Sequence, residues 1–560
     1  MEEFVENNQD IQNKKSKKKN KKGKIIGIIF LVLLLIGVVT CGVLWKLGII
    51  GKTEKVVSTP KQKYAYQMQG NDLQDFDLSF LKIENEEKNK IYSPLSIKYA
   101  LAMLKEGANG ETKKQITDVI GKYSSKKYEN SENMSLANAM FIKDSYKENV
   151  KKEYSNKLKT KYNAEVIYDS FQTAATINNW TKDKTFGLID KLFDDTISEN
   201  DYILVNALAI DMEWNNQIHC SVNHTVPCLV ENYSIYYPHE TIYEAGEDRG
   251  YTATSMIYMR GEESFYQDQN PYINKENRSF NGQEMNYKAS EVLADFNRYD
   301  IIKELGEDKI RAIVKPKYEA WLKTDEGQNM STEEFYMDRY PTDPDKYLDK
   351  YIEEIKTNYN KQSVNTDFYL YEDDDVKSFA KDLKTYNGTT LQYVGIMPKK
   401  EKLADYVKDI KAKDVNKTIQ NLKEVKLDNF EEGYATRIRG LVPLFKFDYE
   451  LKLLEDLQSM GIKDVFNQSK ADLSKMTSAK SFINKAVHKA NIDFSNDGIK
   501  AAAATGMGGA GGTNGGFDYS FKIPSKEIDI TFDNPYMFII RDKSTGEVWF
   551  AGTVYEPTHK

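Results

Sequence analysis

The chain has 560 residues, and its content of 40% hydrophobic and 12% aromatic residues is too high for a disordered polymer. The formal net charge is −7 and only three residues are Cys, which argues against a nucleic-acid partner and excludes a fold built on many disulfide bonds. We therefore expect a mostly globular protein.

The clearest signal near the N-terminus is a run of Lys followed by an apolar segment. Residues 14–24 are rich in Lys, and residues 25–45 are 21 consecutive positions without a charged side chain. A helix of this length can span a bilayer, and the positive charges before it favour a cytoplasmic tail. We expect a basic cytoplasmic tail at 1–24, an uncleaved transmembrane signal anchor at 25–45, a stalk at 46–66, and an extracellular remainder. A lipoprotein processing site at Cys41 is a weaker alternative.

Hydrophobic periodicity predicts a mixture of helices and strands in the remainder of the chain. Ser93 and Pro94 favour the start of a helix, which continues through apolar positions to Gly107. In chain order, we expect helices at 95–104, 150–162 and 173–184, a buried strand at 202–210, and strands at 528–532, 536–540 and 548–554.

Eight short segments carry residue combinations that occur together in one protein family. They are IYSPLS at 91–96, GANGET at 107–112, LANAMF at 136–141, INNW at 177–180, LVNA at 204–207, VHKA at 487–490, AAAA at 501–504 and NPYMF at 534–538. In composition and order they resemble the serpins, a large family of serine-protease inhibitors. The resemblance implies an α+β multi-sheet fold with three β-sheets, about eight or nine helices and an exposed reactive-centre loop.

The resemblance defines a serpin domain at 67–560 and leaves a poorly matching stretch inside it. Residues 220–365 are acidic and rich in Tyr, with helix-like runs at 294–305 and 345–359, so we expect an insertion there. Within this stretch, residues 255–261 resemble a strand of the family. A solvated decoration of the surface and a binding role both remain open for the insertion.

Four polar residues match the positions that open and close the central sheet of serpins, called the shutter, and one Trp matches the upper end of that sheet, called the breach. The shutter residues are Ser93, Ser96, Asn206 and His488, and the breach residue is Trp214. A hydrolase built from Ser and His is the rival interpretation. Because no nucleophile-elbow motif surrounds either Ser, we expect structural roles and no catalytic residue.

The resemblance places the reactive-centre loop at about 496–525 and its hinge at the start of that loop. In serpins, cleavage of the loop lets its N-terminal part insert as a new strand in the central sheet. Alternate residues of a strand point to opposite faces, so the small or apolar set would face inward and Lys500 would face solvent. The hinge residues are Gly498, Ile499, Lys500, Ala501, Ala502, Ala503, Ala504 and Thr505.

Two features of the loop favour slower insertion. Ile499 is bulkier than the small residue that inhibitory serpins usually carry there, and such a side chain would slow insertion between close-packed strands. Beyond Thr505 the loop is rich in Gly, which contributes little packing within a strand. Both features would favour cleavage as an ordinary substrate.

Counting from the hinge places the scissile bond between Gly512 and Thr513. Counting back from the C-terminal side gives Pro524–Ser525 instead, because this region is longer than usual, and we prefer the hinge count. Small residues around the bond would suit an elastase- or subtilisin-like protease, whereas Lys522 would suit a trypsin-like one.

The only cluster of Cys and His residues lies between 219 and 239. Its spacing is looser than that of a structural zinc site, so we expect no metal and no cofactor. A disulfide between Cys220 and Cys228 and a pair of free thiols are the two alternatives.

Taken together, these features predict a membrane-anchored, monomeric suicide-substrate inhibitor, not an enzyme. Its partner would be an extracellular serine endopeptidase, with a cysteine endopeptidase as the alternative target. A non-inhibitory binding or adhesion protein on the serpin fold is the second hypothesis.

Overall fold

The structure is a computed structural model, and it describes most of the chain after residue 72. The described residues are 73–121, 123, 128–194, 197–215, 249–250, 256–260, 279–284, 289–359, 367–495, 498–499, 516–517, 519 and 521–557. Within these ranges, no helix combines the length and the apolar character needed to cross a bilayer. The tail, anchor and stalk expected at 1–66 lie outside the described residues, so that prediction stays a prediction.

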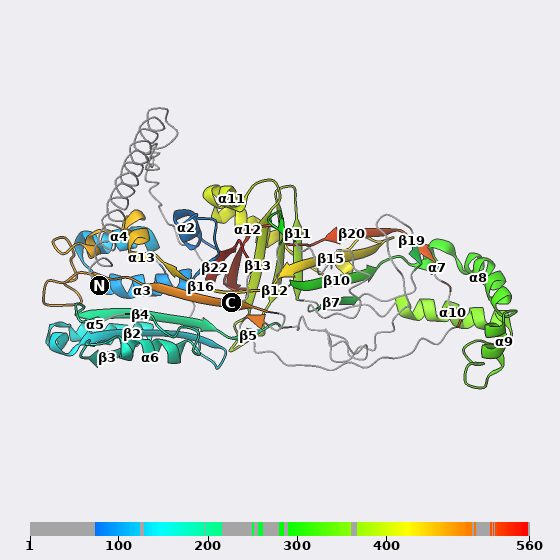
Figure 1. Ribbon diagram of the computed structural model, residues 1–560, viewed down its shortest axis with the longest axis horizontal. Helices are drawn as coiled ribbons and strands as arrows, with labels where there is room; N and C mark the ends of the chain where they lie inside the picture. Colours follow the sequence, from blue (N-terminus) through cyan, green and yellow to red (C-terminus); the bar gives the residue numbers. More distant parts are fainter. Residues whose placement is uncertain are drawn as a thin grey trace, which may run out of the picture. The chain divides into compact units, whose positions relative to one another are not determined.

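The described residues form twelve α-helices, more than the eight or nine expected. Four of them, α7 to α10, follow one another within the stretch expected to be an insertion, and eight lie elsewhere in the chain (Figure 1). The helices are α2 (Asp75–Ile83), α3 (Pro94–Gly107), α4 (Gly110–Ile120), α5 (Lys152–Tyr162), α6 (Ala175–Lys184), α7 (Ile301–Leu305), α8 (Glu307–Trp321), α9 (Asp325–Thr332), α10 (Pro344–Tyr359), α11 (Leu403–Asp409), α12 (Ala412–Asn421) and α13 (Leu453–Ser459).

The start of α3 shows why the local sequence signals succeed. Ser93 is the N-cap residue, and its hydroxyl oxygen accepts a hydrogen bond from the backbone N–H of Ser96 at 3.0 Å. Pro94 occupies the first turn, where its missing N–H costs no hydrogen bond. The predicted helix and the predicted capping role of Ser93 are both confirmed.

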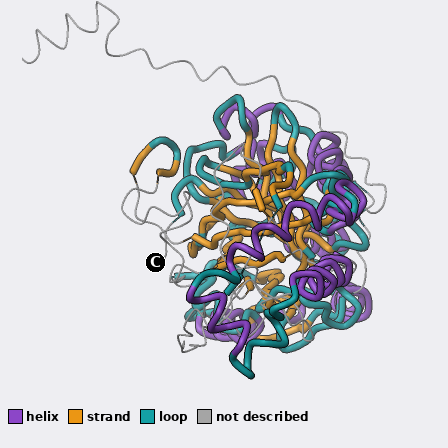
Figure 2. Tube along the Cα trace, turned by 90° about the vertical axis from the view of Figure 1, so that its right-hand side faces the viewer, coloured by secondary structure: helices purple, strands orange, loops and turns teal. Residues whose placement is uncertain are grey.

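The largest sheet has seven strands and forms the buried centre of the molecule. Its order is β1 (Lys90–Tyr92), β22 (Val548–Val554), β21 (Tyr536–Asp542), β13 (Leu391–Pro398), β12 (Val376–Asp382), β11 (Phe368–Glu372) and β14 (Lys423–Glu424). Every residue of β13 and β22 is buried, as expected for strands covered on both faces. Figure 2 shows the strands gathered in the middle, with helices along their outer side.

A second sheet of four strands joins distant parts of the chain. Its order is β20 (Ser525–Asp529), β15 (Ala435–Pro443), β10 (Ala289–Asn297) and β7 (Met256–Arg260). The family-like strand predicted at 255–261 is therefore present. The helix predicted at 294–305 is wrong for residues 294–300, because Ala294 to Asn297 pair with β15 in the sheet and the helix α7 begins only at Ile301.

Two further sheets, of three and four strands, each have an edge strand that borders the candidate site described below. One is β3 (Glu165–Asp169), β2 (Met134–Lys143) and β4 (Tyr202–Ile210), and the other is β16 (Phe445–Leu451), β17 (His488–Phe494), β18 (Gly498–Ile499) and β5 (Met212–Glu213). Together with the two-stranded ribbons β19 (Lys522–Ile523) with β6 (Arg249–Gly250) and β8 (Ser279–Phe280) with β9 (Gln283–Glu284), the described residues form six sheets. The described residues thus show more than the expected three sheets, because β4 and β17 do not pair with each other and because the two ribbons are separate from the larger sheets.

The helices α7 to α10, which we call the helical cluster, have a hydrophobic core of their own. Ile310, Val314 and Tyr318 of α8 are fully buried against Leu348 and Ile352 of α10. The expected helix at 345–359 is confirmed as α10. A stretch with its own core is more than a solvated decoration of the surface.

Candidate functional site

The site begins where the hinge touches the body of the protein. Gly498 and Ile499 form the short strand β18, with β17 on one side and β5 on the other. The Ile499 side chain is 3% exposed and belongs to the hydrophobic core. The fold therefore accommodates this side chain at the start of the hinge, while the expected effect of its bulk on the rate of insertion stays a prediction.

Gly498 lies in a gap that only glycine fits. A Cβ atom at this position would lie 2.2 Å from the carbonyl oxygen of Met212 and 2.7 Å from Cα of Glu213. Both neighbours are backbone atoms of β5, so they cannot turn away as a side chain would. The first hinge residue is glycine because the two backbones approach this closely.

Below the hinge, the two edge strands β4 and β17 border a cavity of about 850 Å³, which we call the slot. Among the described strands, β4 pairs only with β2, and β17 pairs with β16 and, at Phe494 alone, with β18. Two strand edges with backbone N–H and C=O groups therefore border the slot. A segment that continued β18 between them would run antiparallel to β17, as β18 itself does.

The four expected shutter residues all line the slot. The backbone N–H of Ser93 donates a hydrogen bond to Nε2 of His488 at 2.9 Å, which ties α3 to the first residue of β17. The hydroxyl of Ser96 donates a long hydrogen bond of 3.5 Å to the carbonyl oxygen of Asn206 in β4. The amide of Asn206 donates to Oδ1 of Asn138 in β2 at 2.7 Å. Helix α3 thus holds both borders of the slot through polar contacts.

This geometry does not form a nucleophile and a base. The Ser93 hydroxyl oxygen accepts the cap hydrogen bond of α3, and His488 accepts from the Ser93 backbone and not from its hydroxyl. Burial lowers the pKa of His488 to about 4, so the ring is neutral at physiological pH. A neutral ring with an unprotonated Nε2 is the form that can accept the Ser93 hydrogen bond.

The expected breach residue, Trp214, does not line the slot and lies at the far end of β17, beside Phe494. Trp214 is fully buried, its ring lies 5.4 Å from that of Phe494, and its Nε1–H donates to the carbonyl oxygen of Ser495 at 3.0 Å. Trp214 also forms an isolated β-bridge with Leu383. The Trp therefore joins β5, the end of β17 and the large sheet at one point.

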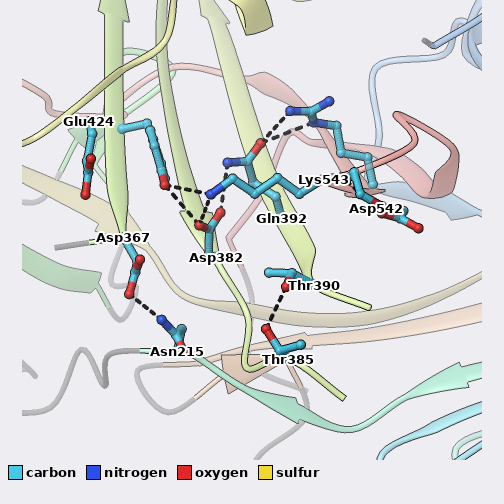
Figure 3. A network of polar contacts seen from close by, with 12 residues as sticks. Asn215, Asp367, Asp382, Thr385, Thr390, Gln392, Glu424, Asp542 and Lys543 are labelled. Carbon is cyan, nitrogen blue, oxygen red and sulfur yellow. Dashed lines mark hydrogen bonds and ion pairs between the residues drawn. The ribbon is translucent and has the colours of Figure 1, made fainter. Parts of the chain in front are cut away.

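A polar network beside Trp214 fastens the end of β5 to the large sheet (Figure 3). The Asn215 amide donates to the carboxylate of Asp367, whose pKa is raised by burial, and the backbone N–H of Asn215 donates to the carbonyl oxygen of Asp382 at 2.9 Å. Asp382 also accepts from Gln392 at 2.8 Å and pairs with Lys543. Sequence reasoning missed this network, because its five members lie in or beside five different strands and form no local motif.

Several expected site residues lie outside the described residues. These are Lys500, Ala501, Ala502, Ala503, Ala504, Thr505, Gly512, Thr513, Cys220 and Cys228. The expected inward and outward alternation can therefore be followed only at Ile499, which is buried as predicted. In the ranges that are described, no group of three His, Cys, Asp or Glu side chains could hold a metal ion.

The C-terminal part of the expected reactive-centre loop belongs to the folded body. Phe521 is buried, Lys522 and Ile523 pair with β6, and Ser525 begins β20, which pairs in parallel with β15. The exposed loop predicted at 496–525 is therefore wrong from about residue 516 onward. A scissile bond at Pro524–Ser525 would lie between two paired strands.

The structure thus combines two strand edges, the slot that they border, and the short strand β18 paired next to the end of β17. A family model described as serpin (serine protease inhibitor) matches residues 73–232 and 321–557. The chain belongs to the serpin family. Residues 233–320 are not matched, and they include β7, β10 and the first half of the helical cluster.

Relatives and solved structures agree with this assignment. Leukocyte elastase inhibitor of Homo sapiens is 32% identical over 227 residues, which cover 38% of this chain and 55% of that protein. An uncharacterized serpin-like protein of Methanosarcina mazei is 29% identical over 175 residues, which cover 31% of this chain and 37% of that protein. The chain thus spans about half the length of the first of these relatives.

A solved structure of thyroxine-binding globulin in complex with thyroxine matches with a TM-score of 0.50 at 16% identity. The match covers 87% of this chain and 97% of that chain, and at this identity it shows the fold alone.

Proposed function

We propose that the protein is a suicide-substrate inhibitor of an extracellular serine endopeptidase. The observation that carries this proposal is the slot between β4 and β17, together with Gly498 and Ile499, which already pair with β5 and with the Phe494 end of β17. An added strand would satisfy the two strand edges and bury the small hinge side chains. Family membership and the names of relatives such as leukocyte elastase inhibitor support the same function.

The proposed reaction uses the catalytic machinery of the target and none in this chain. The Ser hydroxyl of the protease attacks the carbonyl carbon of the loop bond, the C–N bond breaks, and the new amine leaves with a proton. The loop segment that follows Ile499 is then free to extend β18 into the slot, and it carries the ester-linked protease with it. Insertion must outrun hydrolysis of that ester. A cysteine protease would be held by the corresponding thioester.

We place the scissile bond at Gly512–Thr513, within the stretch 500–515 that separates β18 from the packed residue Gly516. Thirteen residues, 500–512, would then lie on the hinge side, which is about 43 Å of strand at about 3.3 Å per residue. That length exceeds the roughly 30 Å of the nine-residue strand β4. The small residues around the bond favour an elastase- or subtilisin-like target.

We further propose that the inhibitor is a monomer displayed outside the cell by the apolar segment at 25–45. The Lys-rich run before this segment supports the orientation, with residues 1–24 in the cytoplasm. Protease protection of an N-terminal tag in intact cells, together with cleavage of the C-terminal domain from outside, is the expected result. Protection of the C-terminal domain would contradict this topology.

The decisive experiment incubates the full chain, purified in a mild detergent, with elastase-, subtilisin-, trypsin- and papain-like proteases. The expected product is a covalent complex that survives a denaturing gel, with mass spectrometry locating the cut within 500–515. The matched control is Ala503→Arg, which places a charge on the inward-facing side of the inserting strand. Cleavage of the wild-type chain with neither a complex nor a rise in melting temperature would contradict inhibition.

The helical cluster favours a second candidate function, a non-inhibitory binding or adhesion protein on the serpin fold. Phe335, which lies between α9 and α10, is 80% exposed, and Met337 nearby is 48% exposed. Exposed apolar residues of this size are typical of contact surfaces. If the wild-type loop is cleaved without trapping any protease, this function becomes the better explanation of the fold.

A further inference from the structure

The C-terminal end of the reactive-centre loop is packed into the core of the helical cluster. Phe517 lies edge-on to Tyr318 of α8 and Tyr347 of α10, with ring centroids 5.0 and 5.5 Å apart. The Phe517 ring also lies 5.8 Å from that of Trp321. Such aromatic pairs stabilise a contact beyond the area they bury. Phe517 thus bridges two helices of the cluster.

The residues on either side of Phe517 are held as well. The carbonyl oxygen of Tyr519 accepts a hydrogen bond from the Tyr351 hydroxyl at 2.6 Å, and Lys317 lies over the Tyr519 ring at 4.7 Å. Phe521 is 4% exposed in the same core. On the other side, Gly516 has a φ of 154°, and a Cβ there would lie 2.2 Å from the Tyr340 hydroxyl oxygen. We call residues 516, 517, 519 and 521 the anchor segment.

The anchor segment leads directly into paired strands. Residues 522 and 523 pair with β6, and Ser525 starts the parallel pairing of β20 with β15 at Ala435. Strand β15 ends at Pro443, and β16 begins at Phe445, which pairs with Phe494 beside Ile499. The anchor segment therefore lies on the hinge side of the slot, beyond the Ala435 end of β15, and not on the His488 side, as the positions of β16, β15 and β20 in Figure 1 also show.

With both ends fixed, the intact loop cannot fill the slot. Sixteen residues, 500–515, connect Ile499 to Gly516. Each residue that extends β18 advances the chain by about 3.3 Å, and the rest must return over the same distance at no more than about 3.6 Å per residue. Even if Gly516 lay beside Ile499, no more than about eight of the sixteen residues could insert before the return segment is taut, and the distance from Ile499 to Gly516 lowers that number. After cleavage no return segment exists, and all residues on the hinge side can insert.

We propose that the helical cluster clamps the C-terminal end of the reactive-centre loop and thereby slows insertion of the uncleaved loop. This inference rests on the proposed function, because it concerns the same insertion. Before an uncleaved loop could insert completely, the anchor segment would have to leave its aromatic contacts, and β19 would have to separate from β6.

The test compares conversion of the uncleaved full chain to a heat-stable form. The clamp variant is Phe517→Ala combined with Tyr519→Ala, and the matched control is Phe335→Ala, which removes an equally large ring from an exposed position in the same cluster. Each protein is incubated below its melting temperature, and the fraction that resists a subsequent heat step is measured. Intact mass confirms that the loop is uncut.

We expect the clamp variant to convert at least about ten times faster than the wild type and the control. A tenfold change corresponds to lowering the barrier to conversion by about 1.4 kcal/mol. Tyr351→Phe, which removes the hydroxyl that donates to the Tyr519 carbonyl and keeps the ring, should give a smaller acceleration in the same direction and covers the case in which the double variant does not fold.

Two other outcomes separate the clamp from the proposed function. If cleavage makes the wild type heat-stable but neither clamp variant converts faster than Phe335→Ala, the clamp is wrong and the inhibitor mechanism stands. If cleavage does not stabilise the wild type at all, the loop does not insert, and both the clamp and the proposed function are overturned.

Discussion

Acidification should weaken the shutter through His488. Burial lowers the pKa of His488 to about 4 from an ordinary value of 6.5. The unfolded chain binds a proton at this residue more readily than the folded chain does. The contribution of neutral His488 to stability is therefore fully present above about pH 6.5 and is lost as the pH falls toward 4. Because proton binding is linked to folding, the free energy of unfolding should fall by about 2 kcal/mol at pH 5 and by about 3 kcal/mol well below pH 4. Protonation of Nε2 also removes the acceptor for the Ser93 N–H.

Urea unfolding of the full chain, followed by Trp fluorescence at pH 7.5, 6 and 5, measures this loss. Other groups also titrate in this range, so the quantity to compare is the difference between wild type and His488→Gln, which cannot titrate. We expect the wild type to lose about 2 kcal/mol more than His488→Gln between pH 7.5 and pH 5. Equal losses in the two proteins would refute the assignment of a neutral, buried His488 at the shutter.

Three further substitutions give distinct results. Lys98→Met leaves the Asp77 carboxylate buried without its cation, since the two side chains are 3% and 1% exposed, and should lower the free energy of unfolding by about 3–5 kcal/mol in urea titrations. Trp214→Phe removes the donor to the Ser495 carbonyl and should cost about 1 kcal/mol in the same assay. Gly498→Ala places a Cβ against the backbone of β5 and should expel β18, which would appear as faster hydrogen exchange around Ile499 and a lower melting temperature. An unchanged exchange rate there would show that the strands can separate to admit a methyl group.

Local sequence signals were sufficient to predict those helices and strands that are determined by interactions between neighbouring residues. The helix after Ser93 follows from a capping hydroxyl and a Pro in the first turn, and both act within a few residues. The strand at 202–210 follows from a continuous apolar run. The serpin motifs then supplied the order of the elements, which local reasoning alone could not.

Features that depend on pairing between distant segments could not be predicted from local sequence patterns. Ala294 to Asn297 follow a helical pattern, but pairing with β15 across more than a hundred residues overrides it. The slot exists because β4 and β17 do not pair with each other, and the sequence of either strand alone does not predict which strands pair. The alternating aromatics Phe517, Tyr519 and Phe521 and the Tyr-rich helical cluster were both visible in the sequence, but only the fold shows that they form one core.

The position of β21 and β22 determines what a cut loop leaves behind. Both strands follow the reactive-centre loop in the chain, yet they lie side by side within the large sheet, between β1 and β13. After a cut anywhere in 500–515, the two polypeptide pieces should therefore stay associated, because the short C-terminal piece supplies two inner strands of the main sheet. The spent protein should migrate as one species on a native gel and as two pieces on a denaturing one. On a cell, the larger piece would keep the proposed anchor, so spent molecules would accumulate at the surface until the cell removes them.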